Sequence, residues 1–137
     1  MPRLTVWMVR TALLELGIGF TLGMWMLFNK GVLIDSYAFA LLGAHIEIML
    51  LGWTIQLALG VAFWILPRFP QPPRYGRERL GWLGYGLING GLLLVVLDTW
   101  ISLNWLPFAG RALELAGVIS FAILIWPRVK AYGQTLA

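Results

Sequence analysis

Six charged or amide side chains lie inside apolar stretches of this sequence that are long enough to cross a lipid bilayer. They are Arg10, Glu15, His45, Glu47, Asn89 and Glu114. A charge at the centre of a membrane helix costs about 2.5–3.5 kcal/mol on insertion scales, so such residues normally pair, face a bundle interior or mark a functional site. Histidine also binds metals through a neutral ring nitrogen. The candidate chemistry is therefore metal ligation by His45, the only histidine in the chain, or a proton relay that includes the glutamates.

Helix periodicity places His45 on a polar and small face of the second apolar stretch. The residues that share this face are Met49, Gly52, Gln56 and Gly60. Glu47 is rotated by about 200° from His45 and points to the opposite side. We expect one side to face the chain's own bundle and the other to face a second subunit or a cofactor. Gly43, Ala44 and Gly52 leave room for a flat macrocycle beside His45.

The other polar residues favour pairing within the membrane. Arg111 and Glu114 are three residues apart and so are neighbours on one helix face. We predict that these two side chains form an ion pair. Glu15 and Glu47 have no cationic partner at their expected depth, and we expect each to be a protonated, hydrogen-bonded carboxyl group.

The elements that must position these residues are membrane helices. Apolar residues make up 60% of the chain and charged residues 12%, with a mean hydropathy of +0.81, whereas soluble domains average about half and a quarter. A spanning helix needs about 20 mostly apolar residues. Four stretches qualify, at residues 4–28, 38–66, 80–101 and 108–126, and none alternates as a β-span would. We predict an all-α, integral membrane four-helix bundle that forms a single domain, 1–137.

Glycine spacing predicts close contacts between these helices. Gly19 with Gly23, and Gly86 with Gly90, form pairs at four-residue spacing, which allow two helix backbones to approach closely. The third stretch is especially rich in glycine, so we expect another helix to pack tightly on it.

Arginine distribution predicts the orientation. The segment PRFPQPPRYGRER after the second stretch contains Arg68, Arg74, Arg77 and Arg79, and the C-terminal tail adds Arg128 and Lys130. The opposite loops offer only Lys30 and Arg111. We therefore expect both termini and the arginine-rich loop in the cytoplasm, in a multi-pass protein of the inner (plasma) membrane. This bias also accounts for the net charge of +4 without a nucleic-acid partner. The absence of cysteine excludes disulfides, thiolate ligands and iron–sulfur clusters.

The second stretch resembles a known family. Ala44-His45, Gly52-Trp53, Gly60 and Leu66-Pro67-Arg68, in this order, are similar to the second transmembrane helix of subunit I of the heme–copper oxidases, closest to the cbb3 and nitric-oxide-reductase branch. In that family a histidine in the outer half of this helix binds the low-spin heme. The family fold is a pseudo-threefold ring of four-helix units, and this chain resembles one unit. Its single histidine cannot build the family's copper site.

The resemblance implies a protein that binds a b-type heme through His45 and serves electron transfer or diatomic-gas binding, with no catalytic residue assigned and enzymatic activity left open. The expected cofactor contacts are His45 as the iron ligand, Met49, Gly52, and Arg111 (in preference to Lys30) at the propionates. The sixth ligand is His45 of another subunit, Met24, Met26 or none. The second ring nitrogen of His45 should be held by a hydrogen-bond acceptor.

The expected partners are membrane lipid, a redox partner and further copies of the chain, with a trimer favoured over a dimer. Two alternatives stay open. One is a membrane subunit or assembly factor without a cofactor. The other is a small proton- or ion-conducting protein that uses the intramembrane glutamates and histidine.

Overall fold

The computed structural model describes residues 1–129, and these form four long helices with no strand. The first span is α1 (Arg3–Gly31), and the second runs from Ala38 through α2 (Leu42–Glu47) and a π-helical segment (Ile48–Ile55) to the end of α3 (Gln56–Ile65). The third span is α4 (Glu78–Ile101), and α5 (Leu106–Ile125) continues through a 3-10 turn to Arg128 as the fourth. All four are long and apolar enough to cross a membrane. The protein is therefore an all-helical, multi-pass membrane protein, as predicted.

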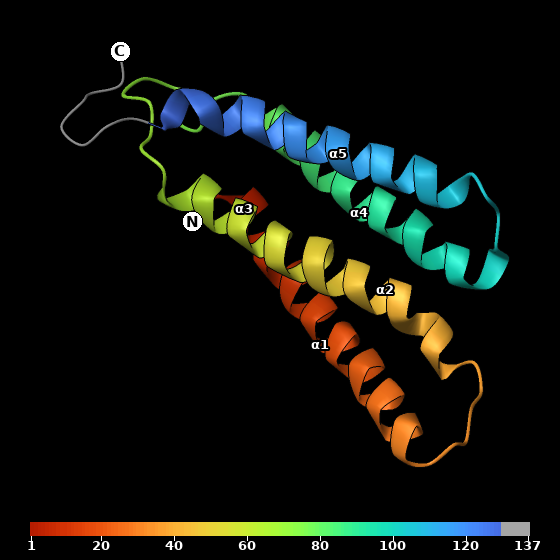
Figure 1. Ribbon diagram of the computed structural model, residues 1–137. Coiled ribbons are helices and arrows are strands. Elements are labelled where there is room, and N and C mark those ends of the chain that lie inside the picture. The colour runs from red at the N-terminus through yellow and green to blue at the C-terminus, as the bar shows by residue number, and fades with distance from the viewer. Residues whose placement is uncertain (130–137) are drawn as a thin grey trace.

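The four spans are arranged as two helical hairpins (Figure 1). One consists of α1 and the second span, and the other of α4 and α5, which lie side by side. The hairpins meet near the N-terminus, and α1 diverges from α4 and α5 toward its own C-terminal end. A buried apolar cluster joins the hairpins where they meet, near the N-terminus. Its members come from all four spans and are Leu4, Met8, Phe63, Ile88, Phe121 and Leu124. Apolar packing therefore concentrates at the end of the bundle that carries the arginine-rich loop.

Glycines bring α4 and α5 into backbone contact. A Cβ atom added to Gly84 would lie 2.9 Å from the carbonyl oxygen of Gly117, and one added to Gly91 would lie 2.5 Å from that of Gly110. Gly86 and Gly90, by contrast, border open space. Tight packing on the third span is therefore confirmed, but the prediction that Gly86 and Gly90 provide it is wrong. Gly86 is rotated by about 200° from Gly84, which turns it away from α5.

We expect Gly91→Ala to destabilise the protein by about 1–3 kcal/mol, because the added methyl group must push α5 away. Gly90→Ala is the matched control, since it adds the same methyl group one residue earlier where no atom lies within 4 Å. The control should be neutral or stabilising by up to about 1 kcal/mol, owing to the higher helix propensity of alanine. Unfolding of the purified proteins by SDS in mixed micelles, followed by circular dichroism, measures both. Equal effects would contradict the α4–α5 contact.

The second span is not a uniform α-helix. Its middle, Ile48–Ile55, is π-helical, and the Thr54 hydroxyl donates a hydrogen bond to the carbonyl of Met49, five residues earlier, at 2.8 Å. π-helical segments are rare and frequently occur at functional sites. In this chain the π-helical segment lies between His45 and Gln56, so it is part of the stretch that carries the polar face.

Candidate functional site

His45 lies in α2, shortly before the π-helical segment, and faces α1. Its Nδ1 atom is 2.8 Å from the carbonyl oxygen of Gly19. Because a carbonyl can only accept, Nδ1 carries the proton and donates it. The ring also packs on Gly23, where a Cβ atom would lie 3.0 Å from the His45 Cε1 atom. Gly19 and Gly23 are thus a close-packing pair as predicted, and Nε2 of a neutral His45 keeps its lone pair for a ligand.

The polar face predicted from His45 to Gly60 is a single face in the structure, and α1 covers it. The Met49 side chain packs on Gly19, and a Cβ atom on Gly60 would lie 2.9 Å from the Met8 Cβ atom. Gly19 and Gly60 must therefore be small residues, because the two helices approach each other closely at these positions. Two of the predicted cofactor contacts, Met49 and Gly52, therefore face α1 within one chain.

The space beside Gly52 is filled by the chain itself. A Cβ atom there would lie 2.9 Å from Oε2 of Glu15, whose carboxyl group reaches across from α1. Ala44 is buried, whereas nothing lies within 4 Å of a Cβ atom on Gly43. Of the three small residues expected to leave room for a macrocycle, Gly43 is the one beside open space, but it is rotated by about 200° from His45 and so does not lie beside it.

Glu15 begins a buried chain of hydrogen bonds across three spans. Gln56 donates to Oε2 of Glu15 at 3.1 Å, and Asn89 donates to the side-chain oxygen of Gln56 at 2.6 Å. Asn89 also donates to the carbonyl of Tyr85 at 2.8 Å. This inner polar chain (Glu15, Gln56, Asn89) links α1, α3 and α4. The expected hydrogen bond to Glu15 is present, and its donor is an amide.

A second cluster lies on the opposite side of the second span. Arg111 Nη2 is 3.2 Å from Oε2 of Glu47, and the exposed fractions of the two side chains are 66% and 7%. Glu114 lies next to Glu47, and its buried Oε1 atom has no hydrogen-bond partner within residues 1–129. We call this set (Glu47, Arg111, Glu114) the outer charge cluster. The prediction that Arg111 pairs with Glu114 is wrong, because the long Arg111 side chain reaches across to α2. Glu47 therefore has a cationic partner.

The two polar sides of the second span both face the chain's own helices. His45 faces α1, and Glu47 faces α5. The opposite directions of these side chains are confirmed. The expectation that one side faces a second subunit or a cofactor is wrong for Glu47, because α4 packs against α2 and the side chains of Arg111 and Glu114 from α5 surround the carboxyl group.

Arg111 is not brought together with His45, since the two lie on opposite sides of the second span. Lys30 is better placed within one chain. It follows Gly23 by seven residues, which puts it within about 20° of the same face of α1 and about 10 Å further along the helix. Lys30 is exposed there.

Arg128 has a structural role that was not predicted from the sequence, where this residue served only as an orientation signal. Arg128 is fully buried, and its guanidinium donates to the carbonyls of Phe63 (2.9 Å), Leu66 (2.7 Å) and Pro67 (2.9 Å). It also lies over the rings of Phe63 and Tyr75, at 5.1 and 5.5 Å from their centroids. Arg128 therefore satisfies the C-terminal end of the second span. The sequence signal for this contact was weak: the pair Pro-Arg stands at the C-terminal end of both the second and the fourth span.

No group of three or more histidine, aspartate and glutamate side chains in residues 1–129 is arranged to hold a metal ion. A heme needs only one or two protein ligands, so this finding does not bear on His45. The fold and the site define a multi-pass helical membrane protein with one histidine and two polar clusters within its spans. Comparison of the chain with protein-family models, curated proteins and solved structures found no match in any of the three.

Proposed function

We propose that this protein binds a b-type heme within the membrane, with Nε2 of His45 as an axial ligand, and acts in electron transfer or in binding of a diatomic gas. The observation that carries the proposal is the 2.8 Å hydrogen bond from His45 Nδ1 to the Gly19 carbonyl. Metal-binding histidines almost always donate their other ring N–H to such an acceptor, which fixes the tautomer and the ring orientation. The neighbouring π-helical segment, typical of functional sites, adds support.

The surroundings of His45 fit a heme on the outer surface of the helix pair. His45 is half-buried, and Leu42 and Ile46, which lie within about 100° of it around the helix, are exposed. The cavities at the ends of the helices do not include His45. A macrocycle ligated by His45 would therefore rest against Leu42 and Ile46, and lipid or another subunit would cover its far side. When bound, heme supplies a redox-active iron whose potential depends strongly on its axial ligand.

Charge placement extends this proposal to the propionates and the oligomer. Lys30 is the cation on the His45 side of one chain. Arg111 is committed to Glu47 on the other side, but its side chain is mostly exposed, so it can reach a propionate only on a neighbouring subunit. A ring of subunits would place the His45 and Lys30 side of one subunit against the Arg111 side of the next. We therefore keep a homotrimer ahead of a dimer, with each heme near a subunit boundary.

The absorption spectrum of the purified protein tests the proposal. A Soret band that shifts on reduction with dithionite is expected, and native mass spectrometry should count one heme per chain in a trimer. One heme per two chains would instead favour a dimer in which two His45 side chains share the iron. A colourless, fully folded protein from heme-replete cells would contradict heme binding and favour a cofactor-free membrane subunit or assembly factor.

The geometry gives less support to a proton-conducting protein. Glu15 contacts Gln56 and then Asn89, and side-chain amides have no titratable proton to pass along. The inner polar chain is better suited to hold three helices together. A proton flux in liposomes that is lost in Glu15→Gln would reverse this judgement.

A further inference from the structure

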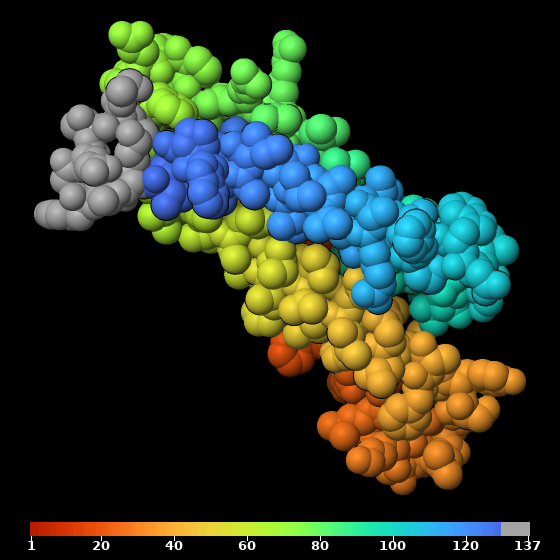
Figure 2. Space-filling view, turned by 45° about the horizontal axis from the view of Figure 1, so that its top comes forward, coloured from red at the N-terminus to blue at the C-terminus, as the bar shows by residue number. Residues whose placement is uncertain are grey.

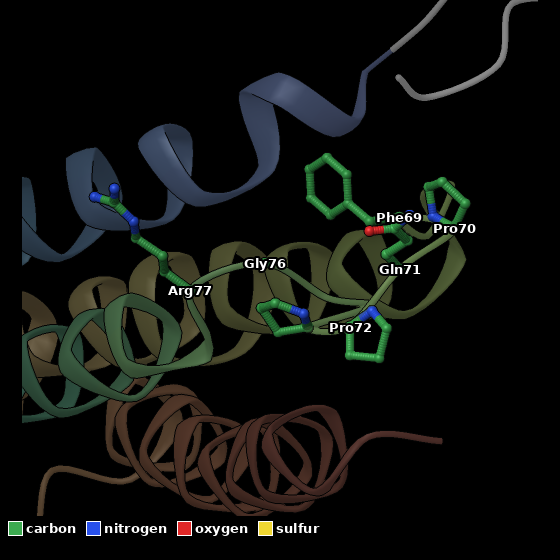
Figure 3. Close-up of a pocket in the computed structure, with 7 residues that line it drawn as sticks. Phe69, Pro70, Gln71, Pro72, Gly76 and Arg77 are labelled. Carbon is green, nitrogen blue, oxygen red and sulfur yellow. The ribbon is translucent and has the colours of Figure 1, made fainter.

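The arginine-rich end of the protein has a groove that the proposed heme function does not use. Its first part is a cavity of about 400 Å³ formed by the loop of residues 66–77 and lined by Phe69, Pro70, Gln71, Gly76 and Arg77 among others (Figure 3). A second cavity of about 310 Å³ shares Phe69, Gly76 and Arg77 with the first and extends to Leu80, Ile123 and Pro127. Because they share three lining residues, the two cavities form one depression.

The depression continues onto the apolar surface of α5. A third cavity of about 400 Å³ shares Ile123 and Pro127 with the second and is otherwise lined by Ala122 and Trp126. Ile123 and Trp126 are 59% and 78% exposed, as expected for side chains that face lipid. We call the three connected cavities the loop groove. Figure 2 shows the loop next to the end of α5, so the groove lies on the surface of the molecule.

Arg77 provides the charge at the polar end of the loop groove. Its side chain extends from the start of α4 toward α5 (Figure 3). Within residues 1–129 the structure gives no ion pair to Arg77. Arg74 and Arg79, which flank it in sequence, are exposed and add positive charge, against the single acid Glu78. The loop groove is therefore cationic at one end and apolar at the other.

We propose that the loop groove binds an anionic phospholipid, with the phosphate on Arg77 and an acyl chain along Ile123 and Trp126. An arginine guanidinium matches two phosphate oxygens at once. Basic pockets beside transmembrane helices bind anionic headgroups, and a charge-assisted contact to the phosphate is roughly twice as strong as a neutral hydrogen bond. A soluble phosphate compound would use Arg77 but gain nothing from the apolar part of the groove.

Native mass spectrometry of the purified full chain, in detergent with added phosphatidylglycerol or phosphatidylcholine, tests this site. The wild-type protein should retain phosphatidylglycerol in preference to phosphatidylcholine. Arg77→Gln should lower the retained phosphatidylglycerol about five- to tenfold. Arg74→Gln is the matched control, because it removes the same charge from the same loop at a residue that does not line the groove. It should change retention less than about twofold. Circular dichroism confirms folding of each variant.

A third variant separates lipid from free phosphate. Ile123→Trp should fill the apolar part and lower phosphatidylglycerol retention, and millimolar glycerol 3-phosphate should not compete with the lipid. Equal losses in Arg77→Gln and Arg74→Gln would overturn the site in favour of general charge attraction. Equal retention of the two lipids, or effective competition by glycerol 3-phosphate, would also overturn it.

Discussion

A His45→Gln variant is expected to fold like the parent and to lose at least about nine-tenths of its heme. Glutamine can still donate a hydrogen bond toward the Gly19 carbonyl, which His45 Nδ1 contacts at 2.8 Å, but it lacks the imidazole nitrogen that we propose as the iron ligand. Changes to groups that merely orient a metal ligand already cost about 10- to 100-fold in affinity, so loss of the ligand itself should cost at least as much. The Soret absorbance per mole of purified protein measures the effect.

His45→Ala is the companion variant, because it removes both the ligand and the hydrogen bond to α1. If His45 serves only as a ligand, both variants should be equally colourless and equally helical. If the hydrogen bond also holds α1 in place, the alanine variant should unfold at a lower SDS fraction than the glutamine variant. Heme content equal to the parent in His45→Gln would show that another residue ligates the iron or that the resemblance to the oxidase helix is misleading.

Arg128→Met should destabilise the protein by about 3–5 kcal/mol, the largest effect on stability that we expect from one substitution. The change removes a buried cation that donates to three carbonyls at the end of the second span. Carbonyls without a partner in a membrane protein each cost several kcal/mol unless water reaches them, and a hydrogen bond to a charged group typically contributes about 1.5–3 kcal/mol. SDS titration of the purified protein measures the loss.

Arg3→Met is the matched control for Arg128→Met, since Arg3 is an exposed arginine at the same end of the bundle. It should change stability by less than about 0.5 kcal/mol. Arg128→Lys should recover only part of the loss, because an ammonium group cannot reproduce the planar fork of a guanidinium. A loss in Arg128→Met no larger than that of the control would contradict the role assigned to Arg128.

Sequence alone determined the class of the fold and the polar face of the second span. Membrane insertion depends on apolar character summed along one helix, so four spans could be found without knowing how they pack. The face from His45 to Gly60 followed from helix periodicity, which is also local, and it persists through the π-helical segment that no residue pattern foretold. The opposite directions of His45 and Glu47 were predicted for the same reason.

Tertiary structure decided which helix meets each of these faces. Periodicity gives the direction of a side chain around its own helix but not the rotation or identity of the neighbouring helix, which depends on packing summed over all four spans. For this reason Arg111 pairs with Glu47 on another helix instead of with Glu114 on its own. Gly84 and Gly91, not Gly86 and Gly90, meet α5. The acceptor for His45 was hidden for a further physical reason: it is a backbone carbonyl, which every residue carries and which only the approach of α1 to α2 selects.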